Sequence, residues 1–122
     1  MTTKLFKDVA EFHETILMDF APPQPTLVSP FYVEGRINFL LEEVSEFMDA
    51  TRAGDIVAAA DGLADIIYVA LGTAYRMGLP FEEIWNAVHA ANMRKARGET
   101  KRDAEVDAMK PEGRVILQAF EL

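Results

Sequence analysis

The sequence contains no cysteine and only two histidines. A disulfide framework, a thiolate nucleophile and a cysteine-ligated zinc site are therefore excluded. The lack of cysteine fits a reducing compartment, and we expect a cytoplasmic protein. The glycine motifs of P-loop and dinucleotide-binding proteins are absent, and so is a nucleophile elbow. Any phosphate chemistry would have to depend on other groups.

Basic residues are also scarce, with 12 Lys and Arg against 20 Asp and Glu and a net charge of −8. This charge argues against binding to a nucleic-acid polymer, which needs a basic surface. It would also repel a bare polyphosphate, unless divalent cations bridge carboxylates and phosphates. In the most apolar segment, the uncharged run from Ile66 to Tyr75 is shorter than the ~20 residues that cross a bilayer. We expect a protein that does not bind a membrane.

Half of the residues are hydrophobic, and they recur at helical spacing. The pattern predicts a single all-α domain over residues 1–122, built as a bundle of four main helices. The expected helices cover residues 4–19, 33–53, 55–77 and 80–97. Gly54 is suited to end the second helix and Asp55 to cap the third, so these two helices should be antiparallel neighbours. The proline-rich residues 21–30 should form a connector or lid, and residues 99–122 a tail that docks on the body or on a partner subunit.

The third predicted helix carries two charges inside an apolar stretch, Asp61 and Asp65. A helix that is apolar all round is normally buried, so we expect a homo-oligomer that covers it. The two aspartates are four residues apart and share one face. Buried carboxylates need partners, either hydrogen bonds and a cation such as Arg36 or Lys95, or a metal ion.

The second predicted helix carries a second acidic group, Glu42, Glu43 and Glu46. Taken alone, this group reads more simply as a solvated acidic face. Both acidic groups, however, lie at similar heights above the turn near residue 54. Four or five carboxylates at one level predict a metal site, and an all-oxygen ligand set selects Mg²⁺ or Mn²⁺ over Zn²⁺.

The fourth predicted helix ends in His89, Asn92 and Lys95, spaced i, i+3 and i+6. Asn and Lys are suited to donate to phosphates or bases. The simpler interpretation is that cations at a helix C-terminus favour the helix dipole. Lys110 begins a second, less specific candidate phosphate contact.

Together these segments resemble the all-α nucleoside triphosphate pyrophosphohydrolases, which include MazG, the phosphoribosyl-ATP pyrophosphohydrolases and the dimeric dUTPases. Glu42-Glu43-x-x-Glu46 resembles the first half of the motif E-E-x-x-E … E-x-x-D, and Asp65 the last acid of the second half. The segments HAANMRK and KPEG resemble the later family motifs. The first acid of E-x-x-D falls on Gly62, where the neighbouring Asp61 could substitute.

The resemblance implies a MazG-like bundle that converts a nucleoside triphosphate to a monophosphate and pyrophosphate. It implies that Glu42, Glu43, Glu46, Asp61 and Asp65 hold Mg²⁺, with Mn²⁺ as a substitute, and that Glu42 or Glu43 accepts a proton from the attacking water. It implies nucleotide contacts from a further group: Arg36, Tyr68, Asn92, Lys95 and Lys110. A homodimer or homotetramer is the expected assembly.

The sequence leaves two questions open. We expect dUTP or a modified nucleotide as the substrate, with phosphoribosyl-ATP of histidine biosynthesis as the enzymatic alternative. The non-enzymatic alternative is a helical interaction module with a vestigial acidic site, which the glycine at position 62 keeps open.

Overall fold

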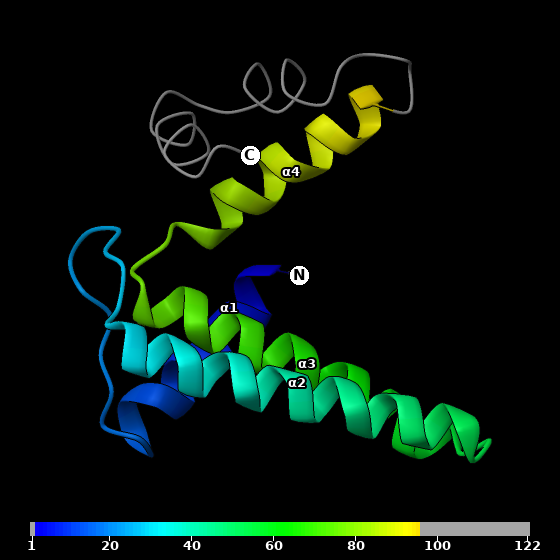
Figure 1. Ribbon diagram of the computed structural model, residues 1–122. Helices are drawn as coiled ribbons and strands as arrows, with labels where there is room; N and C mark the ends of the chain where they lie inside the picture. The colour runs from blue at the N-terminus through cyan, green and yellow to red at the C-terminus, as the bar shows by residue number, and fades with distance from the viewer. Residues whose placement is uncertain (1, 96–122) are drawn as a thin grey trace. The chain divides into compact units, whose positions relative to one another are not determined.

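The computed structural model describes residues 2–95, which form four helices (Figure 1). They are α1 (Thr2–Thr15), α2 (Pro30–Arg52), α3 (Ile56–Arg76) and α4 (Phe81–Lys95). The described range contains no strand, which confirms the all-α, MazG-like fold class. The chain divides into two units, residues 1–79 and 80–122, and α4 is therefore described by itself. The predicted docking of residues 99–122 lies outside the described residues.

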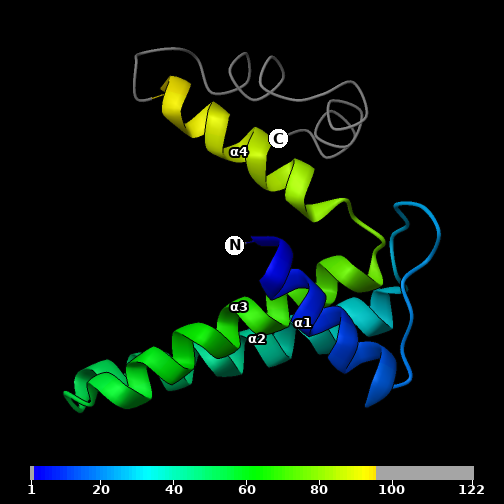
Figure 2. The same cartoon turned by 180° about the vertical axis from the view of Figure 1, so that it is seen from behind.

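The helices α2 and α3 form the antiparallel hairpin that the sequence predicts, and they lie side by side in both views (Figures 1 and 2). Gly54, which follows the C-cap Ala53, has a φ of +71°, a left-handed conformation that glycine adopts at little cost. Asp55 then caps α3, because its Oδ1 accepts a hydrogen bond of 3.0 Å from the Ala58 N–H. Two residues therefore reverse the chain and fix which faces of α2 and α3 meet.

The helix α2 begins at Pro30, three residues before the predicted start at 33. The side chain of Ser29 accepts a hydrogen bond of 3.2 Å from the Tyr32 N–H and caps the helix. Pro30 follows at the first helical position, where its missing N–H costs nothing and its fixed φ suits the helix. The last proline of the connector therefore starts the helix instead of delaying it.

The helix α1 ends at Thr15, and the prediction that it continues to residue 19 is wrong. Met18 adopts a φ of +51°, which no α-helix contains. The chain turns there, and the Asp19 N–H donates a hydrogen bond of 2.8 Å to the His13 carbonyl. The turn brings the Asp19 side chain back beside His13.

The helix α3 is less buried in this chain than its composition suggests. Its most apolar 18-residue window has a mean hydropathy of 1.6, yet only 28% of that window is buried. By length and composition alone this helix could cross a membrane, although it carries Asp61 and Asp65 and packs lengthwise on α2. The expectation that a homo-oligomer covers the rest of α3 stays a prediction.

Candidate functional site

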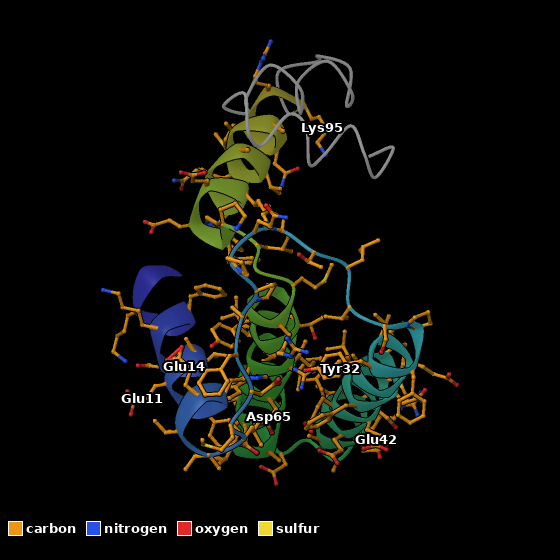
Figure 3. The ribbon with its side chains drawn as sticks, turned by 90° about the vertical axis from the view of Figure 1, so that its left-hand side faces the viewer. Glu11, Glu14, Tyr32, Glu42, Asp65 and Lys95 are labelled. Carbon is orange, nitrogen blue, oxygen red and sulfur yellow. The ribbon has the colours of Figure 1, made fainter. Side chains whose placement is uncertain are left out.

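Three carboxylates meet where α2 packs against α3: Glu43 and Glu46 from α2, and Asp65 from α3. Glu43 is half-buried, and its pKa is raised above the ordinary value. The main cause is desolvation by burial, followed by the negative charges of the nearby Glu46 and Asp65. In Figure 3, Asp65 lies on α3 between α1 and α2.

This group fits a divalent cation by its chemistry. The Glu43 Oε2 is buried and has no hydrogen-bond partner among the described residues. An orphaned carboxylate oxygen beside two further carboxylates is costly without a cation, and hard oxygen ligands are those that Mg²⁺ and Mn²⁺ prefer. Within the part of the chain that the structure describes, no three acidic or imidazole side chains already stand in a ligating arrangement. Cation binding would therefore have to draw the three carboxylates closer together.

The other two predicted ligands stand apart from this group. Glu42 and Asp61 are both exposed, and neither is among the groups that raise the pKa of Glu43. The expectation that Asp61 is a buried carboxylate is wrong for the single chain. Whether Glu42 and Asp61 bind a cation, and whether Asp61 replaces the missing motif acid, stays a prediction.

Gly62 has a packing reason to be a glycine. It is buried on the face of α3 that meets α2. A Cβ added there would lie 3.2 Å from both the Cα and the Cβ of Phe47, which is tighter than ordinary van der Waals contact. The two helices therefore cross closely one turn from Asp65, and an acid at position 62 would have to push Phe47 aside.

Arg36 serves the structure of the hairpin. Its Nε donates to the Thr73 Oγ1 at 3.0 Å, and its Nη2 donates to the Val69 carbonyl at 2.7 Å. The alternative in which Arg36 neutralises the aspartates of α3 is therefore wrong, because its partners are neutral oxygens. A guanidinium has five N–H donors, so donors remain for a ligand, and the predicted nucleotide contact of Arg36 stays a prediction.

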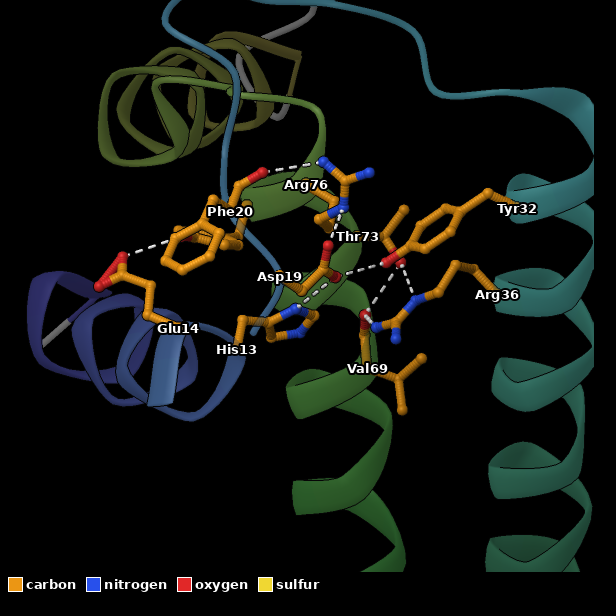
Figure 4. A network of polar contacts seen from close by, with 10 residues as sticks. His13, Glu14, Asp19, Phe20, Tyr32, Arg36, Val69, Thr73 and Arg76 are labelled. Carbon is orange, nitrogen blue, oxygen red and sulfur yellow. Dashed lines mark hydrogen bonds and ion pairs between the residues drawn. The ribbon is translucent and has the colours of Figure 1, made fainter. Parts of the chain in front are cut away.

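A polar network that the sequence analysis missed ties α1 and the connector to α2 and α3 (Figure 4). Asp19 is its centre, since it lies against His13 and Tyr32 at 3.2 Å each and forms an ion pair with the Arg76 Nε. Arg76 also donates from Nη1 to the Phe20 carbonyl at 2.9 Å. The one sequence signal for this network is a histidine in line with the apolar face of α1, four residues after the buried Val9.

The remaining predicted contacts fall in different places. Tyr68 is exposed on α3, and its ring packs edge-on against Phe12 with centroids 5.8 Å apart. Asn92 and Lys95 lie in α4, which belongs to the second unit, and Lys110 lies outside the described residues. Their contacts with a nucleotide stay predictions.

Residues 9–92 match the protein family described as phosphoribosyl-ATP pyrophosphohydrolase. The chain belongs to this family. A search of curated proteins finds no match to the chain. The family is part of the all-α MazG-like pyrophosphohydrolase superfamily, which confirms the resemblance drawn from the acidic motifs.

Membership in the phosphoribosyl-ATP pyrophosphohydrolase family decides between the open readings at the level of the reaction. The protein is an enzyme, a nucleotide pyrophosphohydrolase that cleaves a phosphoanhydride bond. The matched range contains Glu43, Glu46 and Asp65 together with the hairpin that holds them. The family match therefore favours the enzyme over the non-catalytic interaction module.

Proposed function

We propose that the protein hydrolyses phosphoribosyl-ATP to phosphoribosyl-AMP and pyrophosphate. The observation that carries this proposal is the family match, which spans the whole carboxylate-bearing hairpin. The match supports phosphoribosyl-ATP over the substrates that the sequence favoured, dUTP and modified nucleotides. Those triphosphates share the bond that is cleaved, and they remain the rival substrates.

The carboxylates of Glu43, Glu46 and Asp65 would hold one or more Mg²⁺ ions, with Mn²⁺ as a substitute, and Glu42 and Asp61 are the further proposed ligands. A bound divalent cation neutralises phosphate charge and makes a bound water easier to deprotonate. Glu43 is the better candidate to accept a proton from the attacking water. Glu43 is half-buried where α2 packs against α3, whereas Glu42 is exposed.

Product analysis tests the reaction. The full chain is incubated with phosphoribosyl-ATP, dUTP, the four common NTPs and a modified nucleotide, first with Mg²⁺ and then with EDTA. We expect metal-dependent release of pyrophosphate and a monophosphate, fastest from phosphoribosyl-ATP. Faster turnover of dUTP or of a modified nucleotide would overturn the proposed substrate and leave the reaction class in place.

A matched pair of variants tests the site. Glu46→Gln should abolish turnover and also the rise in melting temperature that Mn²⁺ produces by binding the folded state. Glu34→Gln removes an exposed carboxylate from the first turns of the same helix and should change neither. Full activity in Glu46→Gln would show that the metal site lies elsewhere.

A further inference from the structure

One face of α2 carries an unusual row of side chains. Tyr32, Arg36, Phe39, Glu43 and Glu46 are spaced i, i+4, i+7, i+11 and i+14, which places them on one stripe of a helix. We call these five residues the α2 stripe. Its C-terminal end is the carboxylate group beside Asp65, and its N-terminal end is the Asp19 network. The stripe therefore runs from the proposed metal ligands, past Arg36, to a network centred on the Asp19 carboxylate.

Phe39 is the apolar member of the α2 stripe. It lies one helical turn from Glu43, about 6 Å along the helix axis. Phe39 is 44% exposed, although the residues before and after it on the stripe, Arg36 and Glu43, are partly buried. A large aromatic ring left exposed one turn from a carboxylate group can take up an apolar, flat part of a ligand.

Arg36 places a positive charge beside this ring. Its guanidinium carbon lies 5.9 Å from the centroid of the Phe39 ring, within cation–π range. Its bonds to Val69 and Thr73 hold it in place. Both of these partners are neutral oxygens, and Arg36 forms no ion pair with the other residues that the structure describes. A fixed cation without an acidic partner beside an exposed ring suits an electron-rich aromatic ligand that carries negative charge.

We propose that Phe39 is the platform on which the base of the nucleotide stacks, with Arg36 fixed beside it. This inference rests on the proposed function, since the carboxylates at the end of the stripe set where the phosphates lie. One sugar separates the α-phosphate of a nucleotide from its base, and the one-turn spacing between Glu43 and Phe39 has a similar size. Phe39 would determine affinity for the base without touching the bond that is cleaved.

Binding measurements separate the base from the phosphates. The probes are α,β-methylene-ATP, which cannot release pyrophosphate by the normal cleavage, and tripolyphosphate, which has no base, each with Mn²⁺. Base stacking on an aromatic side chain contributes enough that Phe39→Ala should weaken binding of the nucleotide analogue about tenfold. Binding of tripolyphosphate should stay unchanged, because its contacts are to the metal site.

The chain offers matched controls. Phe31 lies on the same helix outside the α2 stripe and is 88% exposed, so Phe31→Ala should leave the affinity for both probes unchanged. Phe39→Leu keeps an apolar side chain without the π-face and should behave like Phe39→Ala. Phe39→Tyr keeps the π-face and should restore binding of the nucleotide analogue.

Three results would overturn the proposal: unchanged nucleotide affinity in Phe39→Ala, an equal loss of tripolyphosphate affinity, or full affinity in Phe39→Leu. Failure of the proposed function looks different. If the proposed function fails, the wild-type protein releases no pyrophosphate from any nucleotide. If only the Phe39 proposal fails, the wild-type protein is active and Phe39→Ala binds the nucleotide analogue as tightly as Phe31→Ala does.

Discussion

At the scale of single residues, Gly72 is the position where the described structure leaves least room. A Cβ there would lie 2.5 Å from the His13 Nε2 and 2.6 Å from the Arg36 Nη2. Both neighbours are held, since His13 is only 2% exposed beside Asp19 and Arg36 donates to the Val69 carbonyl. The side chains of α1 and α2 therefore meet over a bare patch of the α3 backbone.

We expect Gly72→Ala to lower the free energy of unfolding by about 1–3 kcal/mol through overpacking. Urea denaturation followed by circular dichroism measures this loss. Gly35→Ala is the control, because nothing lies within 4 Å of its added Cβ on the exposed side of α2. That change should be neutral or stabilise the protein by about 0.5–1 kcal/mol, as alanine favours a helix interior. Equal effects of the two changes would contradict the account of Gly72.

Glu43 offers a second prediction at this scale. An unfolded chain has Glu43 at its ordinary pKa of 4.5, and the folded chain holds it higher. The folded state therefore binds more protons above pH 4.5, and stability of the metal-free protein falls as the pH rises through this window. Glu43→Gln should flatten that dependence and remove the Mn²⁺-induced rise in melting temperature. If Mn²⁺ still raises the melting temperature of Glu43→Gln, Glu43 is not a metal ligand.

At the scale of elements, Asp19 joins the end of α1 to α3. Its carboxylate forms hydrogen bonds with His13 and Tyr32 and an ion pair with Arg76, and its side chain is 23% exposed. The Arg76 contact is an ion pair rather than a well-directed hydrogen bond, because the Nε meets no hydrogen-bond geometry there. This one carboxylate therefore joins residues of α1, α2 and α3 to the turn that follows α1.

Asp19→Asn should therefore cost about 2 kcal/mol of unfolding free energy, since it leaves Arg76 and His13 without their acidic partner. Thermal and urea unfolding both measure this. Asp8→Asn breaks the exposed i, i+4 pair with Lys4 and should cost less than about 0.5 kcal/mol. A loss in Asp19→Asn no larger than in Asp8→Asn would show that the network does not hold α1 in place.

Tyr75 of α3 is hydrogen-bonded to α1, and we expect it to make the stability of the protein depend on pH. Its hydroxyl donates a hydrogen bond of 2.8 Å to Glu14, and burial is the main cause that raises its pKa above 10.0. Because the folded state keeps this proton longer than the unfolded state does, stability should fall as the pH rises above 10. Tyr75→Phe should cost about 1 kcal/mol at pH 7 and make the decline at high pH shallower. An unchanged slope above pH 10 would show that another group causes the decline.

At the scale of the whole molecule, one flank of the α2–α3 hairpin remains apolar and open in the single chain. A shallow hollow of about 250 Å³ in this flank is lined by Val33, Arg36, Ile37 and Leu40 of α2 and by Ala70 and Thr73 of α3. The apolar row continues along α2 with three exposed residues, Leu41, Val44 and Met48. None of them is acidic, although the chain has a net charge of −8. The homo-oligomer stays a prediction, and this mainly apolar flank, with Arg36 at its edge, is where we expect a second copy to pack.

Leu41→Lys tests the assembly, because it places a charge in the middle of this flank, where the leucine is 60% exposed. If a second copy covers the flank, sedimentation velocity should show a shift from oligomer to monomer. Leu27→Lys in the connector carries the same change at an exposed site and should leave the assembly intact. A wild-type protein that sediments as a monomer would refute the predicted oligomer outright.

The sequence by itself determined the elements that depend on local chemistry. The periodicity of apolar residues predicts all four helices, and Gly54 and Asp55 predict the tight reversal between α2 and α3, because turn and cap preferences depend on neighbouring residues. The tight reversal places Glu43, Glu46 and Asp65 at similar heights above the turn, where they come together. The motif resemblance pointed to the superfamily that the family match confirms.

Only the tertiary structure decided which side chains meet across elements. The turn at Met18, the Asp19 network and the place of Arg36 against Val69 and Thr73 depend on contacts between residues far apart in the chain, which no local pattern encodes. For the same reason Asp61 proved to be exposed while Glu43 is partly buried. Spacing on a helix fixes which residues share a face, but the packing partner decides which face is covered.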